Sequence, residues 1–206
     1  MYPIILITGA TATGKSDLAI QLARHYQAPV ISADSRQCYR FLDIGTAKVS
    51  DSILKEIPHY FISCLNPDES TSAQDFSQRA SSWISSIKSE QKPVIIVGGS
   101  TLYLEALIRP IDPVPPKNPD NIAELEQRAQ EYGLEHIREM LEKADPAYAR
   151  QIDGLNPHRM YRALDVWMQT GKPFSSFHTK TALTIPEHML AFVLHQDRTV
   201  LHERIS

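Results

Sequence analysis

The stretch "GATATGKS", from Gly9 to Ser16, constrains the fold more than any other part of this 206-residue chain. It follows the apolar run "YPIILIT" and precedes "DLAIQLARHY", whose apolar residues recur at helical spacing. This order predicts a strand, a glycine-rich turn and an amphipathic helix. Backbone N–H groups in such a turn line a concave site at a helix N-terminus, where the helix dipole favours anions. The stretch therefore predicts a phosphate-binding loop.

Each polar residue of this loop has an expected role. Lys15 supplies a positive charge for terminal phosphate oxygens, and the Ser16 hydroxyl is a candidate ligand for Mg²⁺. Thr11 and Thr13 offer further hydroxyl donors. The candidate diphosphate- or nucleotide-binding residues are Gly9, Ala10, Thr11, Ala12, Thr13, Gly14, Lys15 and Ser16. The loop alone does not distinguish a diphosphate from a triphosphate.

The first half of the chain alternates short apolar runs with helical patterns. The runs are "PIILIT", "PVISA", "HYFIS" and "PVIIVGG", and a helix is expected over about residues 72–91. Such alternation predicts an α/β fold in which helices cover a parallel sheet. With the phosphate loop, it indicates a P-loop NTPase-like core, in which we expect Trp83 to be a core residue and not a stacking platform.

A proline-rich segment separates this core from a helical region. "RPIDPVPPKNP", from Arg109 to Pro119, cannot be a helix interior or a central strand. Helices are expected over 120–132, 134–143 and 157–170, the last with Asn156 as N-cap and Gly171 as stop. "MLAFVLH", 189–195, is expected to be a buried strand of the sheet. We therefore predict a P-loop core of residues 1–111 and 189–206, with an inserted, mostly helical subdomain at 112–188.

The helix that follows Asn156 has two distinct faces. His158, Arg159 and Arg162 share one face, whereas Met160, Leu164 and Trp167 share another, which we expect to pack. The basic face suits contact with phosphates, but a solvated surface has the same composition.

A carboxylate that could act with the loop follows the second strand, in "ISADSRQCYR". In ATP-using enzymes of this class an acidic residue commonly ends a strand and helps to hold Mg²⁺. Here "PVIIV" runs directly into "GGSTLYLEAL", and the next carboxylate is Glu105. Asp34 instead lies where open α/β sheets place their ligand crevice. A single Asp after a strand also suits a turn or a helix cap.

Composition excludes few function classes. The formal net charge of -3 neither indicates nor rules out nucleic-acid binding, which depends on local patches. No apolar run approaches the ~18 residues of a membrane span, and the N-terminus has no signal-peptide pattern. We therefore expect a cytoplasmic protein with no membrane contact. Cys38 and Cys64 lack metal-binding spacing and are expected to be reduced thiols.

Six segments of the chain, taken together, resemble the tRNA dimethylallyltransferase family, also called tRNA isopentenyltransferases. They are "GATATGKS", "ISADSRQCYRFLDIGTAK", "PHYF", "VGGSTLYLEAL", "NPHRMYRALDVWMQTGKP" and "HQDRTVLHERI". The resemblance implies transfer of a dimethylallyl group from dimethylallyl diphosphate to N6 of the adenine 3′-adjacent to the anticodon in tRNA, with Mg²⁺. It implies that the loop holds a prenyl diphosphate.

The resemblance also implies roles for individual residues. Asp34 matches the general base, Arg198 an arginine over the diphosphate, and Lys15 completes the implied catalytic set. The implied tRNA-binding residues are Asp34, Ser35, Arg36, Gln37, Ser100, His158, Arg159 and Arg162. Tyr39, Tyr103 and Trp167 are expected to be packing residues. The implied partners are the tRNA anticodon stem-loop and dimethylallyl diphosphate, and the implied state is a monomer.

Two positions and the length depart from the family pattern. Ser100 stands where the family often has Thr, and His158 where Gln is common. Family members usually continue for about another hundred residues past the position of Ser206, so we expect a shortened chain. Alternative functions are a P-loop small-molecule kinase, an adenylate (AMP) prenyltransferase, and an RNA-binding fragment without catalysis.

Overall fold

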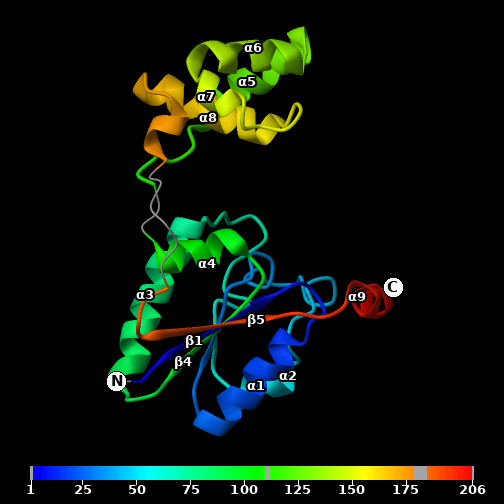
Figure 1. Cartoon of the computed structure of the whole chain (residues 1–206), viewed down its shortest axis with the longest axis vertical. Helices are drawn as coiled ribbons and strands as arrows, with labels where there is room; N and C mark the ends of the chain where they lie inside the picture. Colours follow the sequence, from blue (N-terminus) through cyan, green and yellow to red (C-terminus); the bar gives the residue numbers. More distant parts are fainter. Residues whose placement is uncertain (1, 110–111, 179–184, 206) are drawn as a thin grey trace. The chain divides into compact units, whose positions relative to one another are not determined.

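The computed structural model describes residues 2–109, 112–178 and 185–205. The chain divides into two compact units, the first made of Met1–Pro110 with Ala182–Ser206 and the second of Ile111–Thr181 (Figure 1). The first unit is α/β and the second is helical. The contact with tRNA that we expect of the inserted region stays a prediction. No helix within the described ranges is long and apolar enough to cross a membrane.

Among the described residues, five parallel strands of the first unit form one sheet in the order β3-β2-β4-β1-β5. The strands are β1 (Ile4–Gly9), β2 (Val30–Ser32), β3 (His59–Tyr60), β4 (Val94–Val97) and β5 (Met189–Leu194). Ile5 of β1 pairs with Ile95 on one side and with Leu190 on the other. The predicted α/β fold with a parallel sheet is confirmed.

Helices cover both faces of the sheet (Figure 1). They are α1 (Lys15–Tyr26), α2 (Asp51–Glu56), α3 (Ala73–Ser89) and α4 (Thr101–Ile108), and α9 (Arg198–Ile205) follows β5. Ile5 and Ile7 pack in a core with α1, whereas Ile4 and Leu6 pack with α3 and α4. This two-sided burial explains why β1 reads as a continuous apolar run.

The start of α3 follows from its sequence. Ser72 Oγ accepts a hydrogen bond from Asp75 N at 3.2 Å, and Ser72 N donates to an Asp75 carboxylate oxygen at 2.9 Å. This reciprocal capping box satisfies two N–H groups that a helix start leaves unpaired. Trp83 packs against the core and stacks on Tyr60 at a centroid distance of 5.3 Å. Its predicted packing role is confirmed.

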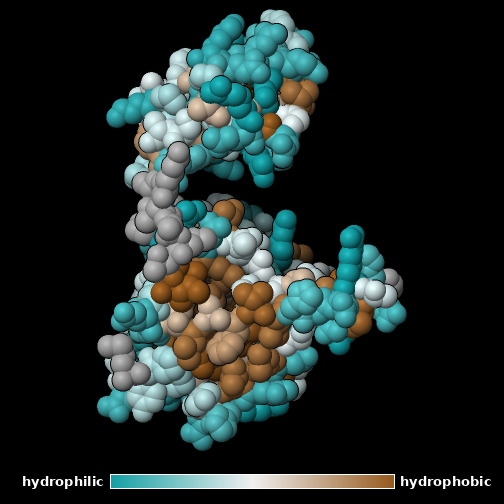
Figure 2. Space-filling view, in the orientation of Figure 1, coloured by the Kyte–Doolittle hydropathy of each residue, from teal (hydrophilic) through white to brown (hydrophobic). Residues whose placement is uncertain are grey.

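The strand predicted at "MLAFVLH" forms as β5, but the prediction that it is buried is wrong. Leu190 and Phe192 are each 49% exposed and Val193 is 73% exposed. β5 is an edge strand that pairs only with β1 in the described structure, so it has one neighbour instead of two. Figure 2 shows hydrophobic residues gathered on this face of the first unit. Apolar composition alone does not distinguish a central strand from such an edge.

The second unit consists of short helices around a separate core. They are α5 (Pro119–Tyr132), α6 (Leu134–Ala144), α7 (Pro146–Ala149), α8 (Pro157–Thr170) and the 3₁₀ turn η1 (Phe174–Phe177). The predicted limits of α8 are confirmed, because Asn156 Oδ1 accepts from Arg159 N at 3.1 Å and Gly171 ends the helix at φ 67°.

One packing prediction for α8 is wrong. Met160 and Leu164 are buried as expected, but Trp167 is 41% exposed. Met168 packs against the core in its place. Met160, Leu164 and Met168 are spaced by four residues, so the buried stripe follows the i, i+4 row of the helix and leaves Trp167 beside it.

Candidate active site

The phosphate loop connects the end of β1 to the start of α1, and two of its glycines are required by geometry. Gly9 has φ 145°, and a Cβ built there would lie 2.3 Å from the Leu194 backbone oxygen. Gly14 is the N-cap of α1 at φ 87° and has no side chain to occupy the first N–H groups of the helix. These N–H groups thus remain suited to an anion.

Two side chains of the loop converge on one backbone oxygen. Thr13 Oγ1 donates to Ala10 O at 2.8 Å, and Lys15 Nζ donates to the same oxygen at 2.5 Å. Burial lowers the pKa of Lys15 from its ordinary value, and the charge of Asp34 acts in the opposite direction. The Asp34 carboxylate is therefore close enough to the Lys15 ammonium to interact with it.

A second cation reaches this loop from the far end of the chain. Arg204 of α9 donates from Nη1 to Ala12 O at 2.9 Å. Sequence reasoning missed this residue, because a contact across 192 positions leaves no local pattern. The predicted diphosphate residue Arg198 is exposed, and its Nε lies 3.5 Å from His202 Nε2. Its role at the diphosphate stays a prediction.

Asp34 lies at the carboxyl edge of the sheet, directly after β2. Its Oδ1 accepts from Arg36 N at 2.8 Å and from Gln37 N at 3.3 Å, so the carboxylate also holds the turn that follows. Asp34 therefore has the turn-capping role that the sequence left open, in addition to any chemical one. Its other oxygen makes no hydrogen bond within the described structure and could accept a proton.

The strand ends fix the position of this turn. Ala33 N donates to Val97 O at 2.7 Å, and Ser100 N donates to Ala33 O at 3.3 Å. Ser100 Oγ accepts from Ser35 N at 2.9 Å. A Cβ on Gly98 would lie 2.1 Å from Ala33 O, so the backbone at Gly98 is too close to the backbone at Ala33 to leave room for a side chain. Ser100, predicted to touch RNA, thus also positions Ser35.

Gln37 closes the segment that follows Asp34. Its Oε1 accepts from Ser32 Oγ at 3.1 Å, and its Nε2 donates to Thr46 O at 3.0 Å and to Ala47 O at 3.3 Å. The amide is therefore engaged inside the protein. Arg36, by contrast, is exposed. The predicted RNA contacts of both residues stay predictions, and the geometry favours Arg36 for a side-chain contact.

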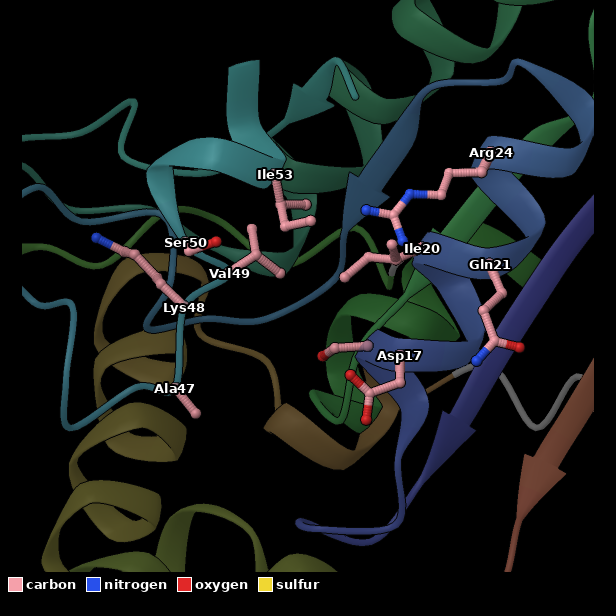
Figure 3. Close-up of a pocket in the computed structure, with 10 residues that line it drawn as sticks. Asp17, Ile20, Gln21, Arg24, Ala47, Lys48, Val49, Ser50 and Ile53 are labelled. Carbon is pink, nitrogen blue, oxygen red and sulfur yellow. The ribbon is translucent and has the colours of Figure 1, made fainter. Parts of the chain in front are cut away.

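A cavity of about 470 Å³ lies between α1 and the segment that leads into α2 (Figure 3). Ile20 and Arg24 extend from α1 toward the wall formed by Val49 and Ile53. Ser16, the predicted Mg²⁺ ligand, is one of the residues that line it. The cavity thus borders the helix that carries the phosphate loop.

The metal and thiol predictions have different outcomes. No cluster of three or more His, Cys, Asp or Glu side chains suited to a metal occurs in the part of the chain that the structure describes. Mg²⁺ in phosphate sites is held mainly by phosphate oxygens and water, and the exposed Ser16 hydroxyl is a suitable single ligand. Cys38 and Cys64 are free thiols as expected, and burial raises the pKa of Cys38 to about 11.

The remaining predicted tRNA residues lie on α8 of the second unit. His158 and Arg159 are exposed there. The Arg162 guanidinium is engaged, because it donates to Asp165 Oδ2 at 2.9 Å and to Pro115 O at 2.5 Å. Asp165 is fully buried and also accepts from Asn121 Nδ2 at 3.0 Å. Arg162 therefore anchors the proline-rich segment to α8, and its predicted phosphate contact stays a prediction.

A glycine-rich loop between β1 and α1, with Asp34 at the same sheet edge, defines a P-loop α/β protein whose site suits a phosphorylated ligand. The family model described as IPP transferase matches residues 37–206. The chain is also 40% identical over 206 residues to a tRNA dimethylallyltransferase of Thioalkalivibrio sulfidiphilus, covering 99% of this chain and 64% of that protein. The chain belongs to the IPP transferase family.

Other similar proteins agree with this assignment. A tRNA dimethylallyltransferase 1 of Bacteroides thetaiotaomicron is 34% identical, over all of this chain and 67% of its own length. A tRNA isopentenylpyrophosphate transferase of Staphylococcus epidermidis, known from a crystal structure, is 32% identical in sequence to this chain. The two structures match with a TM-score of 0.61 over 100% of this chain and 67% of that one. A eukaryotic dimethylallyltransferase acting on tRNA has a TM-score of 0.80 at 27% identity, over 100% and 51% of the two chains. The chain spans 64% of the length of the Thioalkalivibrio relative and of a tRNA dimethylallyltransferase of Nitrosomonas eutropha.

Proposed function

We propose that this chain transfers a dimethylallyl group from dimethylallyl diphosphate to N6 of the adenine 3′-adjacent to the anticodon in tRNA. The observation that carries the proposal is the geometry of the sheet edge, where the phosphate loop with Lys15 follows β1 and Asp34 directly follows β2. The Asp34 carboxylate is a proton acceptor, and the Lys15 ammonium is a cation that can stabilise a leaving diphosphate. Family membership and the tRNA-modifying relatives give this arrangement its substrate class.

The phosphate loop would hold the donor by its diphosphate. The N–H groups that follow Gly14 and the Lys15 ammonium would stabilise the negative charge that develops as the allylic C1–O bond breaks. The Lys15 ammonium donates to Ala10 O at 2.5 Å, and it would exchange this contact for a phosphate oxygen. Ser16 would ligate a Mg²⁺ ion that neutralises charge on the diphosphate.

Asp34 would act on the acceptor. The adenine N6 lone pair attacks allylic C1 as the C1–O electron pair leaves with the diphosphate, and the N6 proton passes to the carboxylate. The Asp34 oxygen that makes no hydrogen bond to the following turn is the one suited to this task. The adenine must leave the base stack to reach the carboxylate, as in other enzymes that modify a base.

The exposed basic residues would position the RNA. Arg36 lies two positions after Asp34, the proposed general base. His158 and Arg159 are exposed on α8. Such contacts with phosphates supply affinity without reading sequence. Action as a monomer in the cytoplasm is part of the proposal.

A labelling experiment tests the function. The chain is incubated with Mg²⁺ and dimethylallyl diphosphate labelled in the prenyl group, together with an anticodon stem-loop or with AMP, and ATP turnover is measured separately. We expect label on the target adenine of the RNA. Label on AMP alone would indicate an adenylate prenyltransferase, and phosphate transfer from ATP a kinase. RNA binding without transfer would indicate a binding fragment, and each of these results would overturn the proposal.

Arg159 and Arg162 should respond differently to substitution. We expect Arg159→Ala to weaken binding of the anticodon stem-loop and to reduce the slope of log K against log salt by about one. Arg162→Ala should instead lower the free energy of unfolding, because it leaves the buried Asp165 without its cation. Salt titrations and urea unfolding of both variants measure the two effects. If Arg159→Ala leaves the slope of log K against log salt unchanged, Arg159 does not contact an RNA phosphate and its face of α8 is a solvated surface.

A further inference from the structure

An unusual set of apolar side chains lies in the loop that follows Gln37. Phe41 is 81% exposed, Leu42 43% and Ile44 97%. Phe41 also has φ 67°, in the left-handed region that bulky residues rarely occupy. These residues, 41–44, are called the loop tip below.

The loop tip is held by a closed set of hydrogen bonds. Lys48, whose side chain is only 4% exposed, donates from Nζ to Tyr39 O at 2.5 Å and to Asp43 Oδ1 at 2.8 Å. Gln37 Nε2 donates to Thr46 O, on the far side of the tip. Hydrogen bonds therefore join the two ends of the loop, and they restrict the conformation of the loop tip.

Nothing within the described part of the protein compensates for the conformation and exposure of Phe41. Its ring is not among the aromatic pairs of the structure and does not join a core cluster. Exposing a large ring to water and placing it at positive φ are both unfavourable. Backbone outliers of this kind concentrate at binding and catalytic sites, where the surrounding structure enforces them.

The position of the loop tip indicates its partner. Gln37 donates its backbone N–H to Asp34, and Phe41 lies four positions after Gln37, a span of at most about 14 Å. The exposed Arg36 lies on the same segment. Arg40 is also exposed, but its guanidinium donates to Ser63 O at 3.2 Å and to Asn66 Oδ1 at 3.0 Å and so braces the segment. Aromatic rings interleaved with cations are the usual surface for unpaired nucleic-acid bases, because every base has a face that stacks on a ring.

We propose that Phe41 is a stacking platform for an unpaired RNA base that neighbours the adenine placed at Asp34, an inference that rests on the proposed function. Extrusion of the adenine would leave its neighbours without a stacking partner. The ring of Phe41 replaces that partner, and Arg36 contacts an adjoining phosphate. The left-handed backbone belongs to a loop that leaves this ring 81% exposed and so open to a base.

The test compares five chains: wild type, Phe41→Gly, Phe41→Tyr, Phe41→Leu and Gln27→Gly. Glycine at position 41 removes the ring and suits the positive φ, whereas tyrosine keeps a ring. Gln27 is the matched control, because it is an exposed residue at φ 48° in the C-cap of α1. Each chain is titrated into two anticodon stem-loops. One carries 2-aminopurine on the 5′ side of the target adenine, and the other carries it on the 3′ side.

We expect Phe41→Gly to bind the RNA on the order of ten-fold more weakly and to lose the fluorescence change of the stacked 2-aminopurine. Its unfolding midpoint should be no lower than that of wild type, because glycine accepts this backbone conformation. Phe41→Tyr should keep both RNA signals, and Gln27→Gly should bind as wild type does. A folding defect cannot produce this combination.

The outcomes separate the two proposals. If wild type binds the RNA and Phe41→Gly binds it equally well, the stacking inference is wrong and the proposed function stands. Wild-type affinity in a Phe41→Leu chain would also overturn it, since an apolar side chain without a ring would then suffice. If wild type does not bind the stem-loop, the proposed function fails and this inference fails with it.

Discussion

Asp34→Asn should reduce prenyl transfer to the anticodon stem-loop by roughly a thousand-fold, the range expected for loss of a general base. The substitution separates the two roles of Asp34. An asparagine Oδ1 can still accept the hydrogen bonds from Arg36 N and Gln37 N, so the turn after β2 should be preserved. The amide cannot accept the N6 proton. Binding of dimethylallyl diphosphate should change little, because the phosphate loop is untouched.

Two further variants complete this experiment. Asp34→Ala removes both the base and the turn acceptor, so it should lose transfer and also some stability. Asp68→Asn, at an exposed carboxylate, should behave as wild type. Single-turnover transfer and equilibrium binding of the donor are measured for each chain. If Asp34→Asn transfers at a near-normal rate, Asp34 is a turn residue and another group accepts the proton.

Gly98→Ala should lower the free energy of unfolding of the first unit by about 3 kcal/mol, the upper end of the usual range for overpacking. The new Cβ would lie 2.1 Å from Ala33 O and 2.4 Å from Ala33 C, both backbone atoms. Ala33 cannot retreat easily, because its N–H and C=O are bonded to Val97 and Ser100. Since Asp34 follows directly, transfer should fall as well.

The protein contains its own probes and control for this measurement. Its two tryptophans, Trp83 and Trp167, lie in different units, so a Trp167→Phe background reports the first unit through Trp83. Gly45→Ala is the matched control, because a Cβ there meets nothing within 4 Å. It should stay within about 0.5 kcal/mol of wild type. Equal unfolding midpoints for the two alanine variants would contradict the close approach of Gly98 to Ala33.

Short-range patterns predicted much of this protein. The phosphate loop, the α/β alternation, the position of Asp34 after β2 and the caps of α8 depend on residues close together in the chain. Each is a local arrangement of backbone donors, helix periodicity or turn geometry, which neighbouring residues suffice to specify. The resemblance of six segments then indicated the family, which the comparisons confirm.

Long-range contacts decided the rest. The sequence did not indicate that Arg204 would reach Ala12, that Arg162 would donate to Pro115 O, or that β5 would lie at an edge. In each case the deciding partner is distant in the chain or depends on the order of strands. The sequence pattern of a basic helix is the same whether its arginine contacts solvent, a phosphate or another part of the protein.

The amino-acid order by itself thus determined the glycine-containing loop between β1 and α1 and the carboxylate that directly follows β2. Only the tertiary structure decided which polar side chains are already satisfied and which remain available. Gln37 and Arg162 are engaged inside the protein, whereas Arg36, Phe41 and Arg159 are exposed. The reason is physical: hydrogen-bond satisfaction and exposure depend on atoms brought together by folding, and neither is a property of a residue type.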